Sequence, residues 1–279
     1  MPELPELEVV KDVLQRRVIG ATIDAVEIIP PGGAIVLRDQ TRLGLSDALV
    51  GATFIDVKRR GKFLILALKR DTADSIYLVI NPKLTGRLQL AQANEKRFAK
   101  THLVLTLSNG AELRYIDQKV MGQVYLVNAP ADILDLVSMG PEPFDISLAD
   151  FRAQLQKFRG EIKGILTRGE FIAGIGNAYA DEILWAARIH PYRKKTQLTP
   201  EEIERLYAAM QTTLRDAIEK VRQEMGEQIH LKPRDFLAVH MKTGEPCPRC
   251  GTPISLVGAN QRITNFCRAC QPGGLIKGM

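Results

Sequence analysis

The residues at the start of the chain can do chemistry once Met1 is removed. Pro2 would then carry a secondary amine, and Glu3 would place a carboxylate beside it. A free α-amino group has a pKa of ~8, so a useful fraction is unprotonated at neutral pH and can form an iminium with an aldehyde. The proline ring fixes φ and so limits the directions of the lone pair. The ordinary alternative is that Pro2 is only the small second residue that permits removal of Met1.

All four cysteines fall into two C-x-x-C pairs near the C-terminal end. Cys247 and Cys250 form the first pair, and Cys267 and Cys270 follow after sixteen intervening residues. Two thiolates at this spacing can chelate from one tight turn, and two such turns complete a tetrahedron around Zn²⁺. Because four thiolates leave no open coordination position, the sequence predicts one structural zinc ion. Two disulfides in a secreted protein are the alternative.

Two further segments have a composition suited to phosphate. The run 58–62 holds four cations and ends at Lys62, directly before an apolar segment. Gly-Ile-Gly-Asn over 174–177 precedes a predicted helix, so backbone N–H groups and the positive end of the helix dipole would face an anion. Each segment has an ordinary alternative. The first suits a solvated turn, and the second suits a tight connection between helices that needs small residues.

The elements that must position these residues change in type along the chain. Apolar side chains recur at helical spacing over 5–19, so the first residues should lie at the start of a helix. From 21 to 128 the pattern becomes short β-branched runs between turn residues, which predicts an antiparallel sandwich or barrel. The predicted strands are 22–29, 53–57, 63–68, 76–80, 103–107, 112–116 and 124–127.

A boundary and a helical region follow the predicted strands. The segment 139–144 is rich in Pro and Gly and comes after one short predicted helix. Thr199, Pro200 and Glu202 are spaced as a capping box at the start of the last predicted helix. The helices predicted after the boundary are 147–158, 160–168, 178–188 and 200–224.

We therefore expect an α+β multidomain chain. Its parts are a helix with an antiparallel β domain over 1–128, a short helix and linker over 129–146, a helical domain over 147–236 and a zinc ribbon over 237–279. The net charge of +6 favours nucleic acid or another acidic partner. No signal peptide or long apolar run is visible, so we expect a reducing cytoplasm and no membrane partner. We also expect a monomer in a bacterial-type cell.

Several segments, taken in order, resemble the formamidopyrimidine-DNA glycosylase family, whose wider group includes endonuclease VIII. They are Pro-Glu-Leu-Pro-Glu-x-Glu at the start, a lysine before a strand, Gly-Ile-Gly-Asn-Ala-Tyr-Ala-Asp-Glu over 174–182, Ile-His-Pro over 189–191 and Gln-Arg-Ile-Thr over 261–264. The resemblance covers essentially the whole chain, from 2 to 271. It implies an N-terminal β-sandwich, a helix–two-turn–helix domain and a zinc finger.

The resemblance also implies an activity, which is that of a nucleoid-associated DNA glycosylase and abasic-site lyase acting on double-stranded DNA with damaged bases or abasic sites. Pro2 would attack C1′ of a nucleotide that has left the helix, Glu3 would supply acid catalysis at the sugar, and the iminium would drive β,δ-elimination. The other matched positions are Glu6 beside the base pocket, Lys62 in the catalytic pocket against phosphate, and Asn177 and Arg262 as phosphate ligands.

The sequence departs from the family where the gap left by the extruded nucleotide is filled. Asn-Pro-Lys-Leu over 81–84 and Asp-Gln-Lys-Val-Met-Gly over 117–122 replace a His-Leu-x-Met-type segment and an Asp-Pro-Arg-Arg-Phe-Gly loop. Leu84, Lys119 and Met121 would supply apolar volume and one cation there, without an aromatic wedge. These changes leave a second function open, namely a relative that binds damaged DNA without excising bases.

A second departure lies between Met225 and Phe236, where the segment is short. The family usually carries a long loop at this place, and that loop covers an extruded oxidised purine. The lesion pocket is therefore expected to be more open, or to be built differently.

Overall fold

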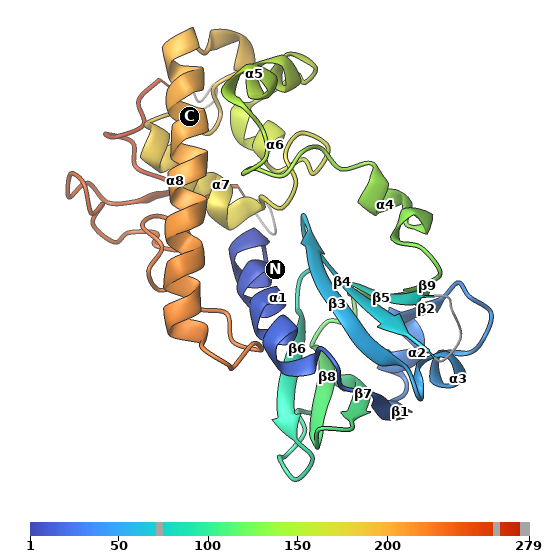
Figure 1. Cartoon of the computed structure of the whole chain (residues 1–279). Helices are drawn as coiled ribbons and strands as arrows, with labels where there is room; N and C mark the ends of the chain where they lie inside the picture. Colours follow the sequence, from blue (N-terminus) through green and yellow to red (C-terminus); the bar gives the residue numbers. More distant parts are fainter. Residues whose placement is uncertain (71–74, 259–262, 274–279) are drawn as a thin grey trace. The chain divides into compact units, whose positions relative to one another are not determined.

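The computed structural model describes residues 1–70, 75–258 and 263–273, and the chain forms two compact units (Figure 1). The first unit comprises Met1–Ser138 together with Val221–Pro233, and the second comprises Met139–Lys220 together with Arg234–Met279. Helix α8 (Pro200–Met225) supplies residues to both units. The division into four parts made from the sequence stays a prediction.

Two β-sheets make up most of the first unit. One has the strand order β1-β7-β8-β6 and the other the order β2-β9-β5-β4-β3. Neighbouring strands are antiparallel as predicted, except that β2 runs parallel to β9. The strands are β1 (Ile23–Ile28), β2 (Leu37–Asp39), β3 (Thr53–Arg60), β4 (Phe63–Lys69), β5 (Ser75–Asn81), β6 (Gly86–Gln92), β7 (Thr101–Leu107), β8 (Ala111–Asp117) and β9 (Gln123–Val127).

Strands β2 and β6 were not predicted from the sequence. The segment of β6, Gly-Arg-Leu-Gln-Leu-Ala-Gln, lacks the β-branched and aromatic residues that usually indicate a strand. It is extended because it pairs with β8 along its whole length, from Gly86 opposite Asp117 to Gln92 opposite Ala111. Tertiary pairing therefore decides the conformation of this segment.

Helix α1 (Leu4–Val18) leads the chain and packs against β3 and β4. Pro5 lies in its first turn, where the missing N–H costs no hydrogen bond. Leu7, Val10 and Leu14 recur on one side of the helix and are buried, which confirms the helix predicted over 5–19. The remaining helices of this unit are short: α2 (Gly32–Val36), α3 (Leu45–Leu49), η1 (Pro130–Asp132) and α4 (Leu134–Val137).

The second unit contains the predicted helices and the ribbon. Phe151, Phe171 and Tyr179 are fully buried in its core. The capping box at the start of α8 is confirmed, since Thr199 N donates to Glu202 Oε2 at 3.0 Å and Glu202 N donates to Thr199 Oγ1 at 3.3 Å. The elements are α5 (Leu148–Gln156), α6 (Ile162–Leu166), α7 (Asn177–Ala187), η2 (Lys195–Gln197), α8, β10 (Ser255–Val257) and β11 (Thr264–Phe266).

Buried charges on α6 and α7 hold the ribbon to the helices. The carboxylate of Glu182 accepts the backbone N–H groups of 238–240 at 2.7 to 2.9 Å. Lys163 pairs with Asp181 at 2.6 Å and donates to Thr264 Oγ1 at 2.8 Å. The position of the ribbon in this unit is therefore set by polar contacts as well as by metal ligands. In the described part of the chain, no helix has the length and apolar character needed to cross a membrane.

Candidate active site and metal centre

The start of α1 places Pro2 and two glutamates in a buried position. Pro2 is buried, and the side chains of Glu3 and Glu6 are each 2% exposed. Glu3 N donates a hydrogen bond to Glu6 Oε2 at 2.8 Å, while Glu3 O accepts from Leu7 N at 3.1 Å. Glu6 therefore fixes the backbone of Glu3, and with it the direction in which the chain leaves Pro2.

A small cavity lies beside Pro2 within the first unit. Its volume is about 20 Å³, which is room for roughly one water molecule and too little for a nucleobase. The segment after α8 forms one of its walls, and Ile229 of that segment is 2% exposed. The short segment is thus packed against this unit, so this side of Pro2 is closed. The lining includes Pro2, Glu6, Leu7, Leu64, Tyr115, Met225, Ile229, Leu231 and Lys232.

Lys62 lies in the two-residue turn that joins β3 to β4. Gly61, the other turn residue, has φ 55°, a left-handed conformation that suits glycine. Arg59 Nη1 donates to Gly61 O at 3.1 Å, and Arg59 Nε donates to the carboxylate of Glu8 on α1. Burial alone would raise the pKa of Glu8, but hydrogen bonds from Lys11 and Arg59 bring it below its usual value. The turn that carries Lys62 is therefore tied to the helix that begins directly after Pro2 and Glu3.

Two neighbouring loops carry the predicted gap-filling residues. Leu84 lies between β5 and β6, while Lys119 and Met121 lie between β8 and β9. The loops are adjacent because Gly86 pairs with Asp117 where each loop meets a strand of the same sheet. Lys119 is exposed and Met121 is 49% exposed, whereas Leu84 is partly buried.

Asn177 is the first residue of α7 in the second unit. Gly176 before it is extended, with φ −122° and ψ −162°, and Gly174 has φ 88°. Asn177 therefore lies at the N-terminal end of an 11-residue helix, where the positive end of the helix dipole favours an anion. Arg262, the other predicted phosphate ligand, lies outside the described residues.

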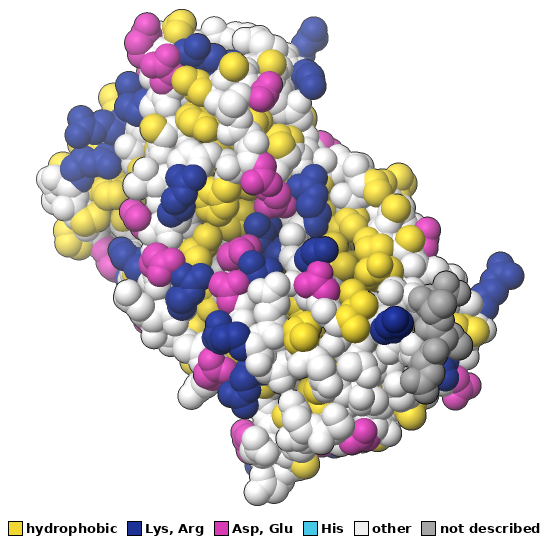
Figure 2. Space-filling model, viewed as in Figure 1, with side chains coloured by type: hydrophobic (Ala, Val, Ile, Leu, Met, Phe, Trp, Pro, Cys, Tyr) yellow, Lys and Arg dark blue, Asp and Glu magenta, His cyan; other side chains and the backbone are white. Residues whose placement is uncertain are grey.

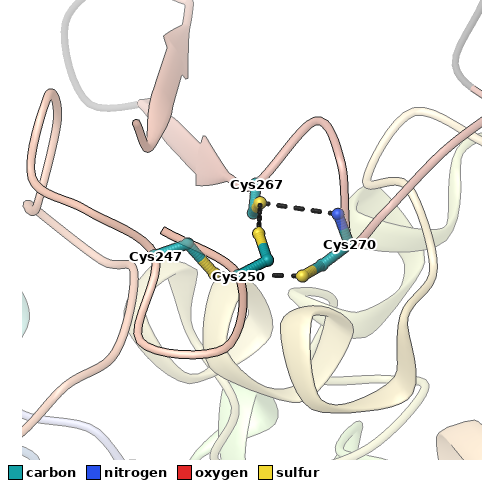
Figure 3. Close-up of side chains that lie close together, drawn as sticks. All are labelled: Cys247, Cys250, Cys267 and Cys270. Carbon is teal, nitrogen blue, oxygen red and sulfur yellow. Dashed lines mark hydrogen bonds between the residues drawn. The ribbon is translucent and has the colours of Figure 1, made fainter. Parts of the chain in front are cut away.

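The four cysteines form a metal centre (Figure 3). Their Sγ atoms all lie within 4.8 Å of one another, and the cysteines are not joined by disulfides. Tetrahedral Zn–S bonds of ~2.3 Å require sulfur atoms roughly 3.8 Å apart, and Cys247 Sγ lies 3.9 Å from Cys270 Sγ. Trp185 Nε1 donates to Cys247 Sγ at 3.4 Å, which links the centre to α7. The predicted zinc site is confirmed.

Some contacts around the site were missed by sequence reasoning. Glu8 was visible in the first motif, and Arg59 was visible in the cationic run, yet nothing in either segment indicates that they pair. Asp117 could have been singled out from the sequence, because it is the first residue of the 117–122 loop that departs from the family. Glu8 and Arg59 are separated by many residues, and they meet only because α1 packs against β3.

The two sheets with their leading helix, the helical unit and the four-cysteine centre define a multidomain zinc-finger protein with a candidate amine site at its N-terminus. Family descriptions match in the same order. The formamidopyrimidine-DNA glycosylase N-terminal domain matches residues 1–124, the H2TH domain of the same enzyme matches 139–228, and the zinc finger found in FPG and IleRS matches 244–273. The chain belongs to the formamidopyrimidine-DNA glycosylase family.

Individual relatives agree over nearly the full length. Formamidopyrimidine-DNA glycosylase of Bacillus cereus is 35% identical, with 98% of this chain and 99% of the relative covered. That of Symbiobacterium thermophilum is 38% identical, with coverage of 98% and 90%. Among solved structures, Lactococcus lactis Fpg with FAPY-dG containing DNA has a TM-score of 0.85 at 31% identity, and covers 97% of this chain and 100% of its own. The same protein with DNA containing an abasic site has a TM-score of 0.83 at 30% identity, with the same coverage.

Proposed function

We propose that this chain is a base-excision repair enzyme that removes oxidised bases from double-stranded DNA and cleaves the resulting abasic sites. Its class, DNA glycosylase, follows from family membership. The observation that carries the proposed lyase activity is the buried Pro2 and Glu3 pair at the start of α1. A protein that only bound DNA would have no need for an amine beside a carboxylate.

The proposed reaction begins at the secondary amine of processed Pro2. Its lone pair forms a bond to C1′ as the bond to the damaged base breaks, and the proton released from the amine nitrogen is taken up by the departing base. The nitrogen lone pair then forms the iminium as the C1′–O4′ bond breaks, and Glu3 transfers a proton to the ring oxygen, which opens the sugar. The resulting iminium makes the C2′ hydrogen acidic. Loss of that proton expels the 3′ phosphate, a second elimination expels the 5′ phosphate, and hydrolysis of the iminium returns the amine.

The proposed roles of the remaining residues follow from where they lie. Glu6 faces the cavity beside Pro2 and holds the backbone of Glu3, so it acts on the geometry of the nucleophile. Lys62 is proposed to contact a phosphate next to the damaged nucleotide, and its turn is held to α1 through Arg59 and Glu8. We assign Asn177 and Arg262 to DNA phosphates, and Leu84, Lys119 and Met121 to the gap left in the duplex.

A panel of lesion duplexes incubated with processed protein and borohydride tests the function. We expect a covalent complex with an abasic duplex and with duplexes whose lesion is excised, because borohydride reduces the iminium to a stable amine. Duplexes that are bound but neither cut nor trapped would favour the other candidate, a relative that binds damaged DNA without excision. Met121 favours this second candidate, because it is exposed and stands where the family has an aromatic wedge.

Excision of 8-oxoguanine paired with cytosine should be slower than excision of formamidopyrimidines or oxidised pyrimidines, while abasic sites should be cleaved well. The segment after α8 is too short to cover a large extruded base, and Met121 gives the orphaned base weaker support than an aromatic wedge. Both changes should slow excision most where a stable base pair must be broken to extrude the lesion. Single-turnover rates on matched duplexes measure this. Equal rates for 8-oxoguanine and the other lesions would show that another element closes the pocket.

Affinity for duplex DNA should fall steeply as salt rises, because the predicted contacts through Lys62, Asn177 and Arg262 are to phosphate. Figure 2 shows Lys and Arg interspersed with Asp and Glu on the visible face. We therefore expect a few well-placed cations to supply most of the affinity for DNA phosphate. Arg262→Ala should lower the slope of log affinity against log salt by about one and weaken all duplexes about equally. Arg268→Ala, an exposed cation in the same ribbon, is the matched control. A loss confined to one lesion would mean that Arg262 reads the base.

A further inference from the structure

The two loops that carry the proposed gap-filling residues meet at one buried carboxylate. Leu84 lies in the first loop, between β5 and β6, and Lys119 and Met121 lie in the second loop, between β8 and β9. Asp117, the last residue of β8, is 0% exposed. A carboxylate that is removed from water needs hydrogen-bond donors, and the loops supply them.

Both oxygens of Asp117 are engaged by backbone or side-chain donors. Oδ1 accepts from the hydroxyl of Thr85 in the first loop and from Lys119 N at 3.2 Å in the second. Oδ2 accepts from Met121 N at 2.9 Å and from Gly122 N at 2.7 Å. Thr85 Oγ1 in turn accepts from Lys119 N at 3.0 Å, so the hydroxyl joins the first loop to the second.

The backbone of both loops is held in a conformation that it would otherwise rarely adopt. Lys83 in the first loop has φ 46° and Val120 in the second has φ 53°. A left-handed conformation is disfavoured for residues with a Cβ, and most strongly for β-branched ones such as valine. A Cβ added to Gly122 would lie 1.7 Å from the hydroxyl of Tyr115, so the second loop also packs closely on the sheet. The hydrogen bonds to Asp117 hold the second loop on both sides of Val120. The first loop reaches Asp117 through Thr85, while Asn81 Oδ1 accepts from Lys83 N at 3.2 Å.

We propose that Asp117 is a positioning residue that locks the two loops together, so that Leu84, Lys119 and Met121 enter the duplex as one preformed unit. This inference rests on the proposed function. Loops that became ordered only on the DNA would lose conformational freedom at each productive encounter, which would slow the filling of the gap. Asp117 takes no part in a bond-breaking step, so it should matter only where a gap must be filled.

Asp117→Asn tests the proposal, because an amide has the shape of the carboxyl group but only one acceptor oxygen. Its NH₂ group would face backbone N–H groups that donate to the carboxylate in the parent protein. We expect single-turnover cleavage of an abasic site in a duplex to fall about tenfold or more. Cleavage of the same abasic site in a single strand should be unchanged, since no partner strand leaves a gap to fill. Asp39→Asn is the matched control. Asp39 accepts Thr41 N at 2.8 Å and Gly44 N at 2.9 Å in an exposed turn of the same unit, and its variant should match the parent on both substrates.

Thr85→Val is a milder variant, which removes only the hydroxyl that joins the loops, and should shift the ratio of duplex to single-strand cleavage in the same direction. It keeps the test valid if Asp117→Asn fails to fold, which circular dichroism and thermal unfolding would show. A parent that cleaves neither substrate refutes the proposed function itself. An active parent with variants that lose both substrates equally, or neither, refutes the role of Asp117.

Discussion

Protein with a blocked N-terminus will form no borohydride-reducible complex with an abasic duplex and will not cleave it. The block can be retained Met1 or acetylation of Pro2, and either converts the Pro2 nitrogen into an amide. An amide has no available lone pair, whereas a free α-amino group with a pKa of ~8 is partly unprotonated at neutral pH. We expect cleavage to fall by roughly 10³-fold or more, as when a covalent nucleophile is removed. Gel analysis of trapped complexes and single-turnover cleavage measure the loss.

Intact mass should be determined first, because it shows which fraction of a preparation has lost Met1. The control is binding to a duplex with a reduced abasic-site analogue, which lacks an aldehyde and should be bound equally by blocked and processed protein. Pro2→Gly is a weaker test, since a processed glycine keeps a primary amine that can act in place of proline. Normal trapping by fully blocked protein would assign the nucleophile to a lysine, and Lys62 would be the first to examine.

The parts of the site that the sequence predicts are those set by neighbours along the chain. Pro2 and Glu3 are adjacent, each C-x-x-C pair needs only one turn, and the capping residues Thr199 and Glu202 are three positions apart. In each case the chemistry and the conformation depend on residues within one turn of each other. Such features can be predicted without knowledge of the tertiary structure.

The parts that the sequence does not predict depend on pairing between distant segments. Strand β6 has weak intrinsic preference for a strand and is extended because it pairs with β8, and Glu8 meets Arg59 only because α1 packs against β3. The segment between Met225 and Phe236 was interpreted as a shortened covering loop. That interpretation stays a prediction. The sequence did not indicate that the segment also supplies a wall of the cavity beside Pro2, where its apolar residue Ile229 is buried within the first unit.

Removal of zinc should unfold the ribbon and lower DNA affinity at the same time. The ribbon has only a small apolar cluster, with Val239 and Ile254 beside Cys247 and Cys267 and with Trp185 of α7 packed against it. Such a cluster cannot stabilise a hairpin in water, whereas structural zinc contributes an apparent ~10–16 kcal/mol at neutral pH. We expect one Zn²⁺ per chain by metal analysis. Cys267→Ser should lose the metal, because serine offers no thiolate.

Removal of zinc should also destabilise the helical part of the second unit. Lys163 donates to Thr264 Oγ1, Asn265 N donates to Asp181, and Glu182 accepts the N–H groups of 238–240. When the ribbon unfolds, these buried charges lose part of their hydrogen bonding, and unpaired buried groups cost ~1–3 kcal/mol each. The thermal unfolding midpoint of the zinc-free protein should therefore fall, which calorimetry measures.

Ala269→Ser is the matched control for Cys267→Ser, because it places a serine at an exposed position between two metal ligands and removes no thiolate. This control should keep zinc, the unfolding midpoint and DNA affinity at the values of the parent protein. The ribbon also carries Arg262, so zinc-free protein should lose affinity for undamaged and damaged duplexes alike. If zinc-free protein binds both with unchanged affinity, the ribbon does not place a phosphate ligand on the DNA.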